Sequence, residues 1–144
     1  MAQTTDPGFR DEAPARALAL LLAAHGPLGA EEWHELERVG AFRRLGISTV
    51  RFRELLQHCA ADVGGSLHDR SWLRAEEADY VNAVLDAVTD PAARLLVLQL
   101  SMAAITADGR ISRDERMVYL HCQARWGISP QRVMQALVAD SAFH

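Results

Sequence analysis

The amino-acid sequence predicts an all-α fold, a single domain of about seven helices. Three observations support this prediction. Alternating strand-like runs are nearly absent, whereas apolar residues recur at helical spacing. Glycine, proline and serine stand where helices would begin and end. The order helix, turn, helix, Gly-Ile-Ser, helix occurs twice, which predicts two pseudo-symmetric three-helix halves, about 14–64 and 90–140, joined by a connecting helix.

The helices can be placed by their capping residues and apolar spacing. We expect them over residues 14–24, 30–45, 49–64, 75–88, 91–105, 113–126 and 130–138. Pro14 suits the first turn of the first helix, because the N–H that it lacks has no helical partner there. We expect residues 1–12 to form a flexible N-terminal tail and residues 13–144 to form the helical domain.

The tripeptide Gly-Ile-Ser, at 46–48 and again at 127–129, marks a corner between two helices. In each copy the glycine suits a left-handed C-terminal cap and the serine suits an N-cap. The isoleucine before the serine can pack on the fourth residue of the following helix, which is Phe52 or Val133.

The segment 91–105 is apolar on almost every side of a helix. Asp90 and Pro91 supply its N-cap and first position. Each buried Leu or Ile side chain contributes about 1.5–3 kcal/mol, so we expect this helix at the centre of the molecule.

An acidic turn, Ala-Asp-Gly-Arg-Ile-Ser-Arg-Asp-Glu at 107–115, is the most informative motif, and it has a weaker copy in the first half. Aligning the two halves pairs Asp108 with His25 and Glu115 with Glu32. The spacing places these side chains at two bends that can face each other across the molecule.

An apolar helix, then Ala-Asp-Gly, an aliphatic residue, a Glu that opens the next helix and a later Gly-Ile-Ser resemble the tellurite-resistance TerB-like family. The resemblance is good from about Pro91 to Leu137 and weak from Ala17 to Leu56. It implies two pseudo-symmetric helical halves and acidic residues that bind a divalent cation, Ca²⁺ or Mg²⁺. It also implies a bacterial stress-response role alongside membrane-associated protein partners.

Carried over residue by residue, the metal-ligand candidates are Asp108 and Glu115, with Glu32 and His25 from the first half. The same residues also have a structural explanation, since Ser112 and Glu115 have the spacing of a capping box. Three functions stay open: a cation-responsive stress module, a helical scaffold whose acidic turns are only caps, and a metal-dependent hydrolase.

Other chemistries fit the sequence poorly. An EF-hand would place Ala104 at its first ligand position, where a side-chain oxygen is needed. The pairs His58–Cys59 and His121–Cys122 would lie about 100° apart on a helix, so we expect buried cysteines rather than zinc ligands. No common catalytic motif is present, so we do not expect an enzyme.

Composition limits which kinds of partner and which cell compartment we expect for this protein. The net charge is −4 and the fifteen basic residues, all arginine, are scattered, so we expect no nucleic-acid partner. Two cysteines without Cys-x-x-Cys spacing fit a reducing cytoplasm. The apolar run 17–24 is too short to cross a bilayer. We therefore expect a cytoplasmic protein that reaches the inner membrane only through a partner.

Overall fold

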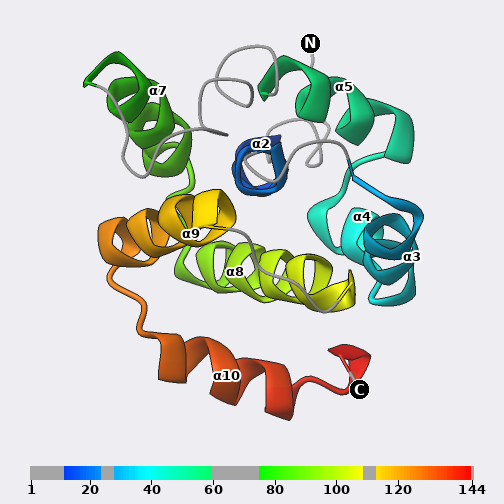
Figure 1. Ribbon diagram of the computed structural model, residues 1–144. Coiled ribbons are helices and arrows are strands. Elements are labelled where there is room, and N and C mark those ends of the chain that lie inside the picture. Colours follow the sequence, from blue (N-terminus) through cyan, green and yellow to red (C-terminus); the bar gives the residue numbers. More distant parts are fainter. Residues whose placement is uncertain (1–11, 24–27, 60–74, 109–112, 144) are drawn as a thin grey trace, which may run out of the picture.

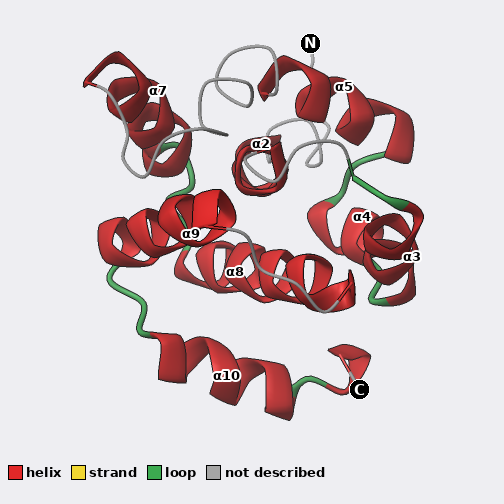
Figure 2. Ribbon diagram, in the orientation of Figure 1, coloured by secondary structure: helices red, strands yellow, loops and turns green. Residues whose placement is uncertain are grey.

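The computed structural model describes residues 12–23, 28–59, 75–108 and 113–143 (Figure 1). Within these ranges all regular structure is helical, with no strand, which confirms the all-α prediction (Figure 2). The helices are α2 (Glu12–Ala23), α3 (Ala30–Arg38), α4 (Ala41–Leu45), α5 (Thr49–Cys59), α7 (Ala75–Asp86), α8 (Pro91–Ile105), α9 (Arg113–Trp126) and α10 (Pro130–Ala139), with the short 3-10 helices η2 (Thr106–Asp108) and η3 (Ser141–Phe143).

Helix α2 occupies the centre of the fold. It packs against α4, α5, α7, α8 and α9, and Figure 1 shows it end-on among its neighbours. Eight of its twelve residues are buried. The apolar run 17–24 is therefore part of a core helix as far as Ala23. Its last residue lies outside the described part. Among the described residues, no helix is long and apolar enough to cross a bilayer.

Helix α8, expected at the centre, shares that position with α2. It packs against α2, α3, α9 and α10, but its first six residues are exposed or half-buried. The first buried residue of α8 is Val97. Helix α8 begins near the surface, where the Asp90 carboxylate accepts the Ala93 N–H at 3.3 Å. The apolar pattern on all sides of α8 correctly predicted that much of this helix is buried. It did not indicate that α2 would also be central.

The single helix expected over 30–45 is two helices, α3 and α4, so the described chain has eight α-helices rather than seven. The break lies at Gly40, whose φ is +72°. That left-handed conformation cannot continue a right-handed helix, and glycine adopts it at little cost. Of the predicted tail 1–12, the structure describes only Glu12, which is the first residue of α2. Residues 1–11 lie outside the described part.

The two Gly-Ile-Ser corners have the predicted C-terminal caps. Gly46 and Gly127 have φ values of 70° and 67°. In each corner the isoleucine N–H donates to the carbonyl five residues earlier, at 3.0 Å to Phe42 and 3.1 Å to Gln123. The glycine N–H donates to the carbonyl three residues earlier. These are the two hydrogen bonds of a Schellman motif.

The serines of both corners act as the predicted N-caps. The Ser48 hydroxyl oxygen accepts the Arg51 N–H at 3.0 Å, and Ser129 accepts the Arg132 N–H at 3.1 Å. The isoleucines of both corners are partly buried against the core cluster that includes Phe52 and Val133. The same short sequence therefore builds the same corner twice.

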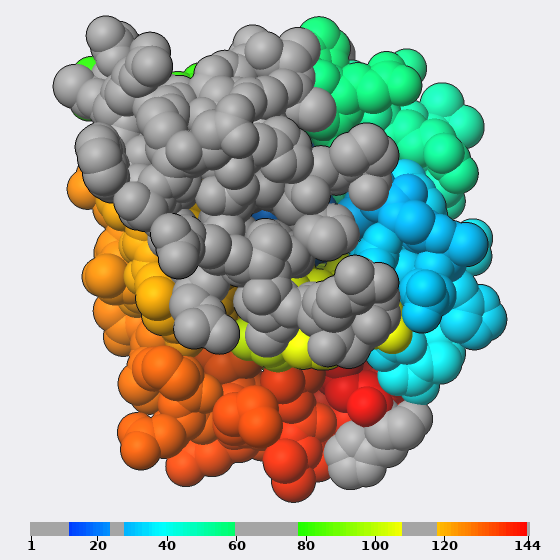
Figure 3. All heavy atoms as spheres, in the orientation of Figure 1, coloured from blue at the N-terminus to red at the C-terminus, as the bar shows by residue number. Residues whose placement is uncertain are grey.

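Rings and ion pairs fix the outer helices. Trp33, Phe42 and Phe52 bring α3, α4 and α5 together, with ring centroids 5.3–6.1 Å apart. Helix α7 is held to α9 because the Arg125 guanidinium donates to Asp86 at 2.7 and 2.9 Å. In the space-filling view, α10 and the end of the chain form one edge of the molecule (Figure 3).

Candidate functional site

The first acidic turn places Glu32 in α3, where its side chain is buried at 4% exposure. A Glu32 carboxylate oxygen accepts the backbone N–H of Gly29, the residue that precedes the helix. This is half of a capping box, because a glycine has no side chain to complete the other half. Glu32 therefore caps its own helix from within the protein.

The other predicted ligands are described only through their backbone or not at all. Asp108 is the last residue of η2, and Glu115 lies in the first turn of α9. Their side chains, and the whole of His25, lie outside the described part, as does the expected cap at Ser112. Helix η2 packs against α3. The elements that carry Asp108 and Glu32 are therefore neighbours in the fold.

In the two adjacent His-Cys pairs, the cysteines are buried, as the sequence analysis expects. Cys59 and Cys122 are both buried thiols. The His121 Nε2 atom lies 2.7 Å from the Asn82 Oδ1 atom, while His58 is exposed. In the described ranges, no group of three or more His, Cys, Asp or Glu side chains could hold a metal ion.

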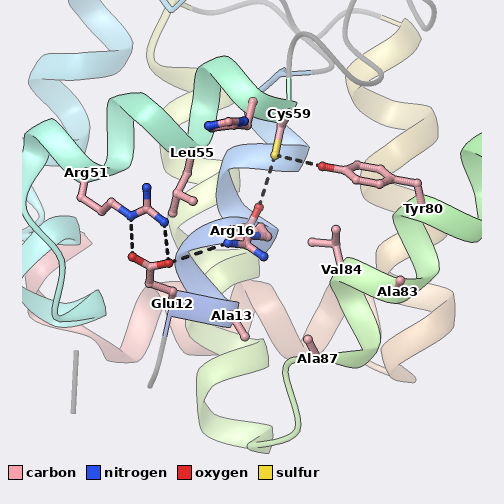
Figure 4. Close-up of a pocket in the computed structure, with 11 residues that line it drawn as sticks. Glu12, Ala13, Arg16, Arg51, Leu55, Cys59, Tyr80, Ala83, Val84 and Ala87 are labelled. Atoms are coloured by element: carbon pink, nitrogen blue, oxygen red, sulfur yellow. Dashed lines mark hydrogen bonds and ion pairs between the residues drawn. The ribbon is translucent and has the colours of Figure 1, made fainter. Parts of the chain in front are cut away.

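A cavity of about 740 Å³ lies between α2, α5 and α7. Figure 4 shows a charged end and an apolar wall. The wall comes from α2, α5, α7 and the residue that follows α7: Ala13, Leu55, Ala83, Val84 and Ala87. Its other lining residues are polar, charged or sulfur-containing: Glu12, Arg16, Arg51, His58, Cys59 and Tyr80.

An ion pair organises the charged end of this cavity. The Arg51 Nε and Nη2 atoms donate to the two Glu12 carboxylate oxygens at 2.6 and 2.9 Å, and Arg51 Nη1 donates to Glu54 at 3.0 Å. The hydrogen bond from Arg51 is the main reason that the Glu12 pKa lies below its ordinary value. Arg16 stands on the other side, with its Nη2 atom 3.7 Å from Glu12. The pair joins the start of α2 to α5.

Across the cavity from the Glu12–Arg51 pair lie the Cys59 thiol and the Tyr80 phenol. The Tyr80 hydroxyl donates to the Cys59 Sγ atom at 3.8 Å, which links α7 to α5 across the cavity. Figure 4 shows this contact opposite the Glu12–Arg51 pair.

A second cavity of about 410 Å³ lies at the start of α8. Arg44 lines it and donates to Asp140 at 2.6 Å, with its guanidinium carbon 5.4 Å from the centre of the Phe143 ring. This arrangement fastens the end of the chain to α4. The guanidinium is therefore used in a tertiary contact.

Sequence reasoning found the acidic turns but missed the larger cavity. Glu12 and Arg16 are four residues apart on one helix, a local signal that predicts only a surface ion pair. Arg51 is separated from Glu12 by 39 positions, so their meeting depends on how α5 packs against α2. No local pattern predicts that contact.

Comparisons of this chain with protein-family models, with curated proteins and with solved structures give no match.

Proposed function

We propose that this chain is a non-enzymatic helical interaction module, organised like a TerB-like domain, whose acidic turns are helix caps. The observation that supports this most directly is the buried Glu32 carboxylate, which accepts the Gly29 N–H. A carboxylate in that bond satisfies a donor that its own helix leaves open. A cation ligand, in contrast, needs oxygen atoms from several residues turned toward one ion.

A duplicated architecture is part of this proposal, and the packing supports it. Helix α2 packs on α5 as α8 packs on α10, and α3 packs on α8 as α9 packs on α2. Contacts of this kind are expected when two related three-helix halves exchange places by a two-fold rotation. In that correspondence Glu115 takes the place of Glu32, so we assign it the same capping role.

The proposed module acts through protein partners in a stress response, as the TerB-like resemblance implies. Membrane-associated partners would give it a place at the inner membrane without any insertion of its own. Helical domains of this size offer several exposed helix faces for such contacts, and function depends on those faces rather than on the fold class.

A cation-responsive module is the second candidate, and one observation favours it. Helix η2, which ends at Asp108, packs against α3, which carries Glu32. A Ca²⁺ or Mg²⁺ ion between these elements would join the two halves and respond to cation concentration. Asp108 and Glu115 would then be the principal ligands, with Glu32 and His25 completing the set.

Thermal denaturation of chelator-treated protein separates the two candidates. If the turns are caps, Ca²⁺ and Mg²⁺ leave the melting temperature unchanged, and Glu115→Gln melts like the wild type because glutamine accepts the same hydrogen bond. If an ion binds, saturation at a hundred times Kd stabilises the wild type by about 2.7 kcal/mol, and Glu115→Gln loses that gain. Glu37→Gln, at an exposed position of α3, is the matched control.

A further inference from the structure

We propose that the cavity between α2, α5 and α7 binds a small amphipathic monocarboxylate. Its carboxylate would lie at Arg16 and Arg51, and its hydrocarbon tail would lie along the apolar wall. The volume of about 740 Å³ lies within the range of about 300–1,000 Å³ common for small-molecule sites. No element that carries an acidic turn lines it, so this proposal is independent of the proposed function.

The guanidinium groups at the charged end have hydrogen-bond donors to spare. Arg51 uses one N–H on each of its three nitrogens, for Glu12 and Glu54, and a guanidinium has five N–H groups. The Arg16 Nη2 atom is 3.7 Å from Glu12, beyond hydrogen-bond distance, and its side chain is 48% exposed. Both groups can therefore donate to a ligand oxygen, and Figure 4 shows them on either side of Glu12.

The side chains at this end favour a singly charged ligand over a doubly charged one. Two arginines and one glutamate line it, and Glu54, outside the lining, also pairs with Arg51, so two guanidinium groups face two carboxylates. A carboxylate supplies one charge and two coplanar oxygens, which match the planar fork of a guanidinium. A doubly charged phosphate would be repelled more strongly by Glu12 and Glu54.

The apolar wall is suited to a hydrocarbon tail. Three of its five residues are alanines, one on α2, one on α7 and one just after α7, and their small side chains leave the space open. Leu55 and Val84 supply larger apolar surfaces on α5 and α7. Covering this wall with a hydrocarbon tail removes apolar surface from water on both partners.

Isothermal titration with octanoate tests the proposal. We expect saturable binding to the wild type, about ten-fold weaker binding to Arg16→Gln, and loss of binding to Ala83→Trp, which fills the cavity. The matched controls Arg132→Gln and Ala124→Trp change exposed residues outside the cavity lining and should bind like the wild type. Circular dichroism checks that each variant is folded.

Glu12→Gln gives an effect of opposite sign. It removes the negative charge beside the ligand and weakens the interaction of residue 12 with Arg51, with which the ligand competes. Octanoate should therefore bind about three-fold more tightly. A purely structural role for Glu12 would give weaker binding or none. If that variant fails to fold, Arg16→Gln against Arg132→Gln still decides the question.

Three results would overturn the proposal: no saturable binding of octanoate to folded wild type, equal binding of uncharged 1-octanol, or equal weakening by Arg16→Gln and Arg132→Gln. None of these results depends on a divalent cation or on a protein partner. A failure here therefore leaves the proposed function standing, and a cation response in the melting experiment leaves this proposal standing.

Discussion

At the scale of single residues, the Glu12–Arg51 pair makes folding dependent on pH. Hydrogen bonding from Arg51 holds the pKa of Glu12 below its ordinary value of 4.5, so the folded state favours the charged carboxylate. The resulting stability is complete above the unfolded pKa and is lost as pH falls through the lower folded value. Arg125 and Arg38 lower the pKa values of Asp86 and Glu35 in the same direction.

We therefore predict that Glu12→Gln loses less stability than the wild type when the pH falls below 4.5. The reason is that the variant has one fewer carboxylate to protonate on unfolding. Urea unfolding at a series of pH values measures this difference. Parallel stability curves for the two proteins would contradict the assigned role of Glu12.

Cys122 gives a second residue-scale prediction. Burial raises the pKa of its thiol to about 12, and none of its surface is exposed. Because the thiolate is the reactive form, native protein should leave Cys122 unmodified by iodoacetamide, whereas denatured protein should react fully. Mass spectrometry of labelled peptides measures this. Rapid labelling in native buffer would contradict the buried placement.

At the scale of elements, the corner at Gly127 can be tested alone. An added Cβ would meet no atom within 4 Å, so the cost of Gly127→Ala arises from the left-handed backbone and not from crowding. We expect a loss of about 1–2 kcal/mol in the free energy of unfolding. Gly127→Asn is the matched control, because asparagine accepts this conformation more readily. Equal losses for the two variants would argue against the left-handed assignment.

Capping residues made most helix boundaries and both Gly-Ile-Ser corners predictable, because such signals are local. The break at Gly40 was missed because an isolated glycine can also lie inside a helix. The Glu32 cap at Gly29 has the spacing of a capping box but lacks its side-chain donor or acceptor at the N-cap. The cavity was missed because its charged end joins α2 to α5 through packing alone.

At the scale of the whole molecule, α2 is a central helix that packs against α4, α5, α7, α8 and α9. Leu20 is fully buried, so Leu20→Ala should cost about 2–5 kcal/mol through lost burial and a new cavity. The same substitution at Leu120, which is 51% exposed, should cost less than about 0.5 kcal/mol. Urea unfolding compares the two directly. Similar losses would place the centre of the core elsewhere.

The molecule has a central α2, two matching corners and an acidic side chain that caps a helix. Because α3 and η2 are neighbours, the two acidic turns belong to the same region of the fold. What they do there decides between a helical interaction module and a cation-responsive one.

Anomalous diffraction from a crystal grown with Mn²⁺ tests that choice most directly, since Mn²⁺ favours the same oxygen ligands as Mg²⁺ and is visible by its own scattering. If the acidic turns are caps, we expect no anomalous peak between α3 and η2, with Glu32 on the Gly29 amide and Glu115 on the Ser112 amide. A peak bonded to Asp108 and Glu115 would contradict the capping role.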